Sequence, residues 1–146
     1  MKRTMENNTI TIAARVHAPA EYAWECYTRP EHIIHWNFAS PDWHCPAAKS
    51  DLKPGGKFAY TMASRDGKAS FDFEGVFNEL IPGQLLRYSI ADGRAVEVYF
   101  IEEPDITLVR IKFEAENFHT IEQQRDGWQS ILNEFVRYTE ALYNAR

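Results

Sequence analysis

The sequence predicts an α+β domain in which a curved, six-stranded antiparallel sheet wraps around one long C-terminal helix. From Thr120 onward the apolar residues recur at helical spacing in one stripe, whereas the chain between Lys57 and Phe113 alternates with the period of strands. A helix is about 10 Å wide and strands lie about 4.8 Å apart, so one helix covers only about two or three strands of a flat sheet. The sheet should therefore curl around the helix, and such an arrangement tends to leave a space between them.

The N-terminal part of the chain predicts one strand and two short helices. Thr9 to Val16 alternates between apolar and polar residues, as a half-buried strand does. Pro19 opens a first short helix, and Thr28-Arg29-Pro30-Glu31 supplies a capping box for a second one, Pro30 to His35. Residues 1–8 have no apolar core and are predicted to be a flexible N-terminus, so that the domain spans residues 9–146.

Turn signals divide the middle of the chain into five further strands, which gives the order β-α-α-β-β-β-β-β-α. These signals are Pro54-Gly55-Gly56, Asp66-Gly67, Pro82-Gly83, Asp92-Gly93 and Glu103-Pro104-Asp105. Successive strand residues point to opposite faces, so alternation assigns the inner face. The outward residues are charged, namely Asp72, Glu74, Arg87, Glu97, Arg110 and Lys112. The inward residues are apolar and largely aromatic, namely Phe58, Tyr60, Met62, Phe71, Phe73, Leu86, Tyr88, Ile90, Val96, Val98, Phe100, Val109, Ile111 and Phe113.

Composition argues against several classes of partner. The 146 residues carry a formal net charge of -5 and no basic stripe, so no nucleic-acid partner is expected. No stretch approaches the roughly 20 apolar residues of a membrane span, which predicts a cytoplasmic protein without membrane insertion. Cys26 and Cys45 fit that compartment as free thiols.

No metal, cofactor or nucleophile site is predicted. His32, His35, His44 and Cys45 lie close together in sequence, but their spacing is not that of a metal-ligand pair. Cys45 beside His44 does not predict a nucleophile and base, because adjacent side chains in an extended loop point apart. The glycines after Pro54 lead into a strand, whereas dinucleotide-binding glycines lead from a strand into a helix.

Acid–base catalysis is the enzymatic alternative, since a carboxylate in an apolar cavity has a raised pKa and can shuttle a proton. The candidates are Glu114, Glu116 and Asp92, with Arg94 beside Asp92 as a charge partner. Arg94 could equally pair with Glu116 or with a ligand carboxylate. Alternation places Glu114 and Glu116 opposite Phe113, facing solvent, so no catalytic residue is assigned.

Several segments resemble the START-like (SRPBCC, helix-grip) superfamily. The resemblance is carried by Trp36, by the segment from Asp51 to Phe58 and by Asp126-Gly127-Trp128, and it extends from Thr9 to Tyr143. It is closest to the branch similar to the activator of a heat-shock chaperone's ATPase. The resemblance implies a hydrophobic cavity between sheet and helix. Relatives bind lipids, sterols or polyketides, some catalyse cyclisation, and others are chaperone partners.

From the residues and the resemblance together we expect a small hydrophobic or amphipathic ligand, bound without a cofactor. The alternatives left open are a co-chaperone-like interaction module and a cyclase-type or hydrolytic enzyme. The eukaryotic activator has a separate N-terminal chaperone-binding domain that this chain lacks, so ATPase stimulation is not expected. The same aromatic residues can also simply fill the interior. The expected ligand-binding residues are Trp36, Trp43, Phe58, Tyr60, Phe71, Phe73, Tyr88, Arg94, Phe100, Phe113, Trp128, Leu132 and Phe135.

Overall fold

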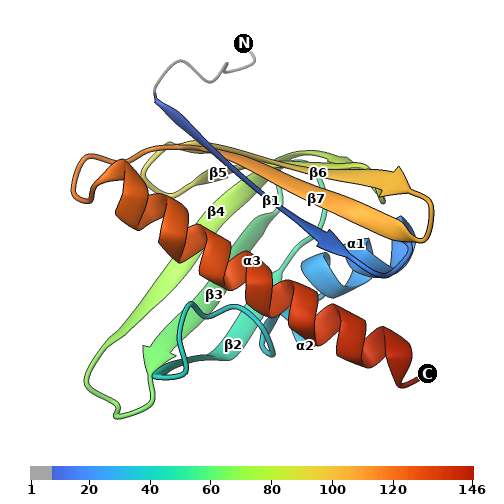
Figure 1. Cartoon of the computed structure of the whole chain (residues 1–146). Coiled ribbons are helices and arrows are strands. Elements are labelled where there is room, and N and C mark those ends of the chain that lie inside the picture. Colours follow the sequence, from blue (N-terminus) through green and yellow to red (C-terminus); the bar gives the residue numbers. More distant parts are fainter. Residues whose placement is uncertain (1–7) are drawn as a thin grey trace.

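The computed structural model describes residues 8–146 and shows one antiparallel sheet, two short helices and a long C-terminal helix (Figure 1). The sheet order is β1-β7-β6-β5-β4-β3-β2. The predicted α+β architecture with a curled sheet is confirmed. The strands are β1 (Thr9–Val16), β2 (Trp43–Ser50), β3 (Lys57–Ser64), β4 (Ser70–Ile81), β5 (Leu85–Ile90), β6 (Ala95–Glu103) and β7 (Ile106–Glu114), and the helices are α1 (Ala20–Thr28), α2 (Pro30–Ile33) and α3 (Ile121–Asn144).

The described part of the chain forms seven strands, so the prediction of six was wrong. The missed strand is β2, an edge strand that pairs only with β3. Its register shifts between His44 and Ala47, and Pro46 lies inside that irregularity. Proline has no N–H to donate and is tolerated at sheet edges and bulges, where the alternating apolar pattern of a strand is also weakest. The loop predicted between Trp36 and Leu52 therefore contains a strand.

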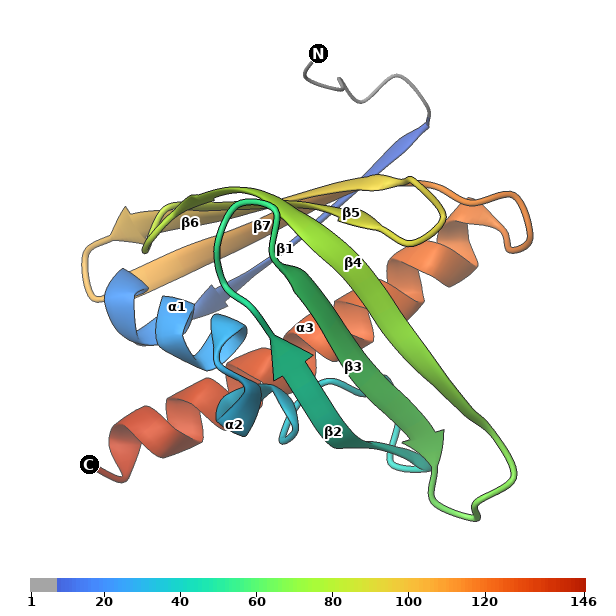
Figure 2. The same ribbon diagram turned by 180° about the vertical axis from the view of Figure 1, so that it is seen from behind.

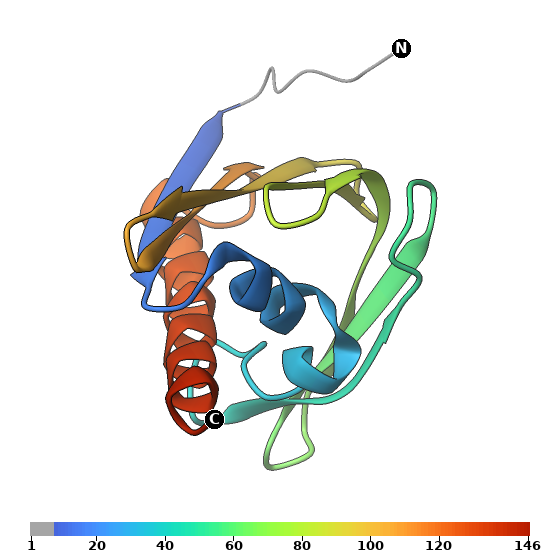
Figure 3. The ribbon, with the colours of Figure 1, turned by 90° about the vertical axis from the view of Figure 1, so that its right-hand side faces the viewer.

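The sheet bends into an arch, and α3 crosses its concave side (Figures 1 and 2). Figure 3, which looks roughly along α3, shows α1 and α2 in the opening at one end of the arch. Gly75 of β4 lies at a crowded point of the inner face: an added Cβ would lie 2.4 Å from the Ser89 carbonyl oxygen and 2.5 Å from Cζ of Phe58. The glycine is required because the Phe58 ring lies directly against the strand.

The predicted inward set is buried or half-buried, with the exception of Phe71, whose side chain is 51 % exposed. The hairpin between β3 and β4 extends past α3 (Figures 1 and 2), so the helix does not cover Phe71. Farther along β4, the pairing with β5 shifts between Phe77 and Glu79. This bulge lets both Phe77 and Leu80 pack towards the core, although they have opposite parity.

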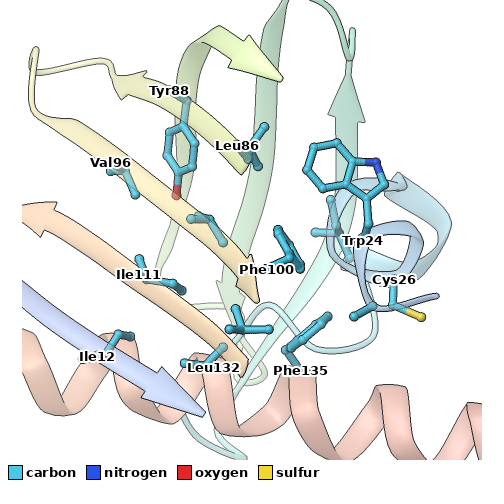
Figure 4. Packing of buried hydrophobic residues seen from close by; sticks show 14 of the residues in the cluster. Ile12, Trp24, Cys26, Leu86, Tyr88, Val96, Phe100, Ile111, Leu132 and Phe135 are labelled. Atoms are coloured by element: carbon cyan, nitrogen blue, oxygen red, sulfur yellow. The ribbon is translucent and has the colours of Figure 1, made fainter. Parts of the chain in front are cut away.

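Helix α3 begins with a capping box: the Thr120 hydroxyl accepts from the Gln123 N–H at 3.0 Å, and the Gln123 side chain accepts from the Thr120 N–H at 3.0 Å. Trp128, Leu132 and Phe135 face the concave side of the sheet as predicted. Leu132 and Phe135 are buried (Figure 4), and Trp128 stacks on Phe113 of β7 at a centroid distance of 4.0 Å. The apolar stripe therefore docks the helix.

The capping box predicted at Thr28 is not formed. Helix α1 continues through Thr28, whose hydroxyl donates to the Trp24 carbonyl oxygen at 2.7 Å, as hydroxyls inside helices commonly do. Helix α2 is also shorter than predicted: it ends at Ile33 rather than at His35.

The described residues include no helix that is both long and apolar enough to cross a membrane. Most of the predicted flexible segment, residues 1–7, lies outside the described part of the chain. Asn8 is described, and its carbonyl oxygen accepts from the Ala115 N–H at 2.8 Å.

Candidate ligand-binding cavity

A cavity of about 270 Å³ lies between the concave face of the sheet and α3. Strands β3, β4 and β5 supply most of its wall, α3 supplies the facing side, and α1 and the α2–β2 connection close one end. The side chains that line it are Tyr27, Trp36, Asn37, Phe58, Tyr60, Met62, Phe71, Phe73, Phe77, Leu86, Tyr88, Arg94, Ile111, Trp128, Ile131 and Leu132.

The wall consists of aromatic rings that brace one another. Phe58 is at its centre, with ring centroids 4.9 Å from Tyr60, 5.0 Å from Phe77 and 5.1 Å from Tyr88. Across the cavity, Trp128 of α3 meets Phe73 edge-on at 6.1 Å. Contacts with neighbouring rings of the sheet thus hold these rings in place, and the space between them and α3 stays open.

Nine of the thirteen predicted site residues line this cavity. They come from the α2–β2 connection, β3, β4, β5, the β5–β6 turn and α3, and they are Trp36, Phe58, Tyr60, Phe71, Phe73, Tyr88, Arg94, Trp128 and Leu132.

The other four predicted site residues lie outside the lining and pack against other rings. Phe100 meets Trp24 at 5.4 Å, Phe135 meets Trp36 at 5.2 Å, and Phe113 lies under Trp128. Trp43 of β2 contacts Phe71 at 5.9 Å. Alternation predicts which face of the sheet a ring occupies, but it does not predict which part of that face is filled by the helices.

Seven lining residues are absent from the predicted site. Met62, Leu86 and Ile111 were predicted to face inward but were not assigned to the site, and the other four are Tyr27, Asn37, Phe77 and Ile131. Continuing the alternation of Phe71 and Phe73 past Gly75 would have identified Phe77. Tyr27 and Ile131 belong to helices whose apolar stripes were assigned to docking. Asn37 carries no local signal, because a single asparagine after a tryptophan is typical of many loops.

Three tyrosine hydroxyls belong to this cavity. Burial raises the pKa of Tyr27, Tyr60 and Tyr88, and the mutual influence of the three phenols raises the pKa of Tyr60 and Tyr88 further. All three therefore stay neutral at physiological pH and can donate a hydrogen bond. Figure 4 shows the Tyr88 ring extending from β5 into the interior.

Arg94, immediately before β6, is the single charged residue among the described residues that line the cavity. Its Nε donates to Asp92 Oδ2 at 2.8 Å, and its Nη1 donates to the Glu114 carbonyl oxygen at 3.2 Å. The side chain is 20 % exposed, and its charge counteracts part of the effect of burial on the pKa of Tyr88. Arg94 is thus held at the β5–β6 hairpin end of the cavity, next to Tyr88.

The carboxylates considered for catalysis do not line the cavity. Asp92 is exposed and pairs with Arg94. Glu116 pairs with His119 at 2.9 Å rather than with Arg94. Glu114 is fully buried, so the prediction that it faces solvent was wrong. Its Oε1 accepts from the Ala95 N–H at 2.7 Å, where the β6–β7 ladder ends, and the carboxylate thereby serves as a backbone acceptor.

Two of the histidines that lie close together in sequence, His32 and His35, contact Tyr138 of α3. His32 forms a hydrogen bond of 2.6 Å with the Tyr138 hydroxyl, and the His35 ring stacks on the ring of Tyr138 at 5.4 Å. Cys26 and Cys45 are buried free thiols, as predicted. Residues 8–146 contain no cluster of three or more His, Cys, Asp or Glu side chains that could hold a metal ion.

Chemically, the site offers apolar surface, neutral hydroxyl donors, one amide and one guanidinium. No carboxylate belongs to the described residues that line it. Such a lining suits binding of a molecule with a large apolar part and few polar atoms.

Comparison with known proteins agrees with this architecture. Residues 17–140 match the family described as Activator of Hsp90 ATPase homolog 1-like protein. No curated protein matches the sequence. The solution structure of an AHSA1-like protein from Aeromonas hydrophila is 42 % identical, with a TM-score of 0.88, and the match covers 92 % of this chain and 94 % of that chain. A protein from Cytophaga hutchinsonii is 43 % identical, with a TM-score of 0.79 and 96 % and 97 % of the two chains covered.

The family match begins just after β1 and spans α1, α2, strands β2 to β7 and most of α3. The two solved relatives extend the likeness to nearly the full length of each chain. This chain therefore belongs to the AHSA1-like family, within the START/SRPBCC helix-grip superfamily.

Proposed function

We propose that the protein binds a small, largely apolar aromatic ligand in the cavity between the sheet and α3. The observation that carries this proposal is the cavity of about 270 Å³, which is lined by aromatic rings that contact one another. Protein interiors are normally packed as densely as organic crystals, and voids larger than a water molecule are few. An aromatic-lined space of this size in an otherwise filled core is typical of a binding site.

The volume limits the ligand. Pockets for small molecules usually measure about 300–1,000 Å³, and a dry apolar cavity of about 150 Å³ accommodates benzene. A volume of about 270 Å³ therefore suits a compact molecule of one or two fused rings rather than a long lipid. The exposed Phe71 stands at the edge of the cavity, where a ligand can enter beside the β3–β4 hairpin.

Tryptophan fluorescence tests the proposal, because Trp36 and Trp128 line the cavity. Naphthalene and its singly substituted derivatives should change the emission saturably, whereas a long-chain fatty acid should have a weaker effect. No saturable response to any aromatic compound, together with unchanged amide NMR shifts for the lining residues, would refute the proposal.

A blocked variant locates the site. Leu132→Trp adds bulk to the lining, so calorimetry should detect no binding while circular dichroism shows a folded protein. Leu142→Trp on the same helix is the matched control, because Leu142 is half-buried and lies outside the lining. Equal binding by Leu132→Trp and the unmodified chain would place the ligand elsewhere.

A second candidate is a chaperone partner, which the description of the family names. The observation that favours it is the 91 % exposure of Phe118 in the β7–α3 connection, where Glu116 Oε1 accepts from the Phe118 N–H at 3.1 Å. The test is the ATPase rate of the cognate heat-shock chaperone with and without this protein. We expect no stimulation, and stimulation that is lost in Phe118→Ser would rank this candidate first.

A further inference from the structure

We infer that the ligand carries an uncharged hydrogen-bond acceptor, such as a ketone oxygen, which Asn37 and Tyr60 recognise at the end of the cavity closed by α1 and α2. This inference rests on the proposed function and specifies the chemical class of its ligand. It concerns the polar groups of the lining that the apolar wall does not explain.

Asn37 is the main observation. The residue is 6 % exposed, and its Nδ2 is buried with no hydrogen-bond partner among the described residues other than the Cys45 thiol. The amide does influence the Cys45 thiol, where it opposes the larger effect of burial on the pKa, but sulfur is a weak acceptor. A buried polar group without a strong partner is destabilising, and an acceptor atom of the ligand would supply the missing hydrogen bond of Asn37.

The position of Asn37 is fixed by its surroundings. Its backbone N–H donates to the Ile33 carbonyl oxygen at 3.1 Å, and the preceding Trp36 is anchored by a bond of 2.9 Å from its Nε1 to the Cys26 carbonyl oxygen. These two bonds hold the backbone at Asn37 in place, and the 6 % exposure of the residue shows that its amide is enclosed by the surrounding side chains. A preformed donor of this kind recognises an acceptor without much loss of conformational entropy.

The tyrosines at the same end add donors. The Tyr27 ring lies 5.1 Å from the ring of Trp36, the residue before Asn37, and Tyr60 of β3 lies opposite Ala48 of the edge strand β2. Because burial keeps Tyr27 and Tyr60 protonated, they present O–H groups and no negative charge. A carbonyl oxygen has two lone pairs and can accept from Asn37 and from Tyr60 together.

The charges of the lining favour a neutral acceptor. No carboxylate among the described lining residues could pair with a cationic ligand. Arg94, the one cation, lies at the β5–β6 hairpin, on the strands farther from β2, and already bonds Asp92 and the Glu114 carbonyl oxygen. An anion bound next to Asn37 would lose its hydration without gaining a counter-charge, which is strongly unfavourable.

Three naphthalene derivatives of one shape test the inference: methyl naphthyl ketone, isopropenylnaphthalene and naphthoate. The first two differ by exchange of the ketone oxygen for a methylene group, and the third carries a charge. In the unmodified protein the ketone should bind more tightly than naphthoate, and its carbonyl infrared band should move to lower frequency on binding, as hydrogen-bonded ketones do.

Asn37→Leu replaces the amide by an apolar side chain of similar size. The ratio of the alkene Kd to the ketone Kd should fall about three- to tenfold. This factor corresponds to the net free energy that one hydrogen bond contributes to binding. The carbonyl band should lose most of its shift. Asn133→Leu, at an exposed position of α3, is the matched control and should leave the ratio and the band unchanged.

Tyr60→Phe, which removes one oxygen atom, is the second variant should Asn37→Leu fail to fold, and the same fall in the ratio is expected. An unchanged ratio and band in a folded variant would overturn the inference and leave the proposed function standing. Tighter binding of naphthoate that is lost in Arg94→Gln would also overturn it, because the polar end of the ligand would then lie at the hairpin. Failure of all three compounds to bind would instead refute the proposed function itself.

Discussion

The interior of this domain has a filled half and an open half, although both are lined by aromatic residues. In the filled half, next to α1 and α2, the Trp24 ring meets Phe100 at 5.4 Å (Figure 4). Phe135 packs at 5.2 Å against Tyr27, which lies at the border with the cavity. In the open half, rings such as Phe58 contact neighbours on the same sheet and face the cavity.

The difference shows that the number of covering helices, rather than the residue type, decides whether aromatic side chains close a core. Near β6 and β7, Trp24 of α1 contacts Phe100 and Trp128 of α3 stacks on Phe113, while Trp36, which follows α2, packs on Phe135 of α3. Near β3, β4 and β5, α3 is the main covering element, and one helix is too narrow for a curved sheet of this width. The cavity is therefore a consequence of architecture, and its shape is set by where α1 and α2 end.

Phe135→Ala is the change with the largest expected effect. Phe135 is fully buried and has ring contacts with Tyr27 and Trp36 at 5.2 Å. Its truncation should create a new void in the filled half and lower the free energy of unfolding by about 3–5 kcal/mol, measured by urea denaturation.

Phe73→Ala is the matched truncation in the open half. Phe73 is half-buried and already borders the cavity, so its loss should enlarge an existing space and cost only about 1–2 kcal/mol. Equal losses for Phe73→Ala and Phe135→Ala would contradict the distinction between the two halves.

Gly75→Ala tests how tightly the wall of the open half is built. The added methyl would meet the Ser89 carbonyl oxygen and the Phe58 ring at distances well below van der Waals contact. Relief of this clash requires both a shift between β4 and β5 at Ser89 and a movement of the Phe58 ring, which lines the cavity, so we expect a loss of about 1–3 kcal/mol and weaker ligand binding. Gly67→Ala is unsuitable as a control, because the φ of Gly67 is +77° and alanine would be strained there. Ala59→Gly, on β3, is the control that measures how far a general weakening of the sheet affects ligand binding. Unimpaired ligand binding by Gly75→Ala would show that the wall can yield without closing the cavity.

The long helix and the alternating strands were predictable because each has one buried face, which imposes a period on the sequence. The edge strand β2 was not, because Pro46 and a register shift interrupt its period. At the site, alternation correctly placed Phe58 and Tyr88 on the inner face. It could not separate them from Phe100, because the path of α1 over Phe100 depends on packing between distant segments. Glu114 is buried although alternation places it on the outer face, because its carboxylate accepts a backbone hydrogen bond where the β6–β7 pairing ends.

Gly127→Ala should stabilise the protein. Gly127 precedes Trp128 in α3, over the open half, and an added Cβ would meet no atom within 4 Å. Close approach to a strand therefore does not explain this glycine. Alanine should raise the free energy of unfolding by about 0.5–1 kcal/mol, readable as a higher urea midpoint. If the glycine instead lets the helix open for ligand entry, the stabilised variant should also bind and release ligand more slowly in stopped-flow measurements, at unchanged affinity.

The smallest effect concerns the connection that leads from β7 into α3 above the open half. The hydrogen bond from the His119 side chain, followed by backbone N–H groups of His119 and Phe118, holds the pKa of Glu116 below its ordinary value of 4.5. A lowered pKa means that the folded protein prefers the carboxylate, so this contribution to stability is present above pH 4.5 and is lost as the pH falls through the lowered value. Glu116→Gln should therefore reduce stability at pH 7 and have less effect near about pH 3, where the unmodified side chain is largely protonated in the unfolded chain. Urea midpoints at the two pH values measure the difference. If Glu116→Gln costs the same at both, the carboxylate charge contributes nothing here, and the connection is held by the geometry of its hydrogen bonds alone.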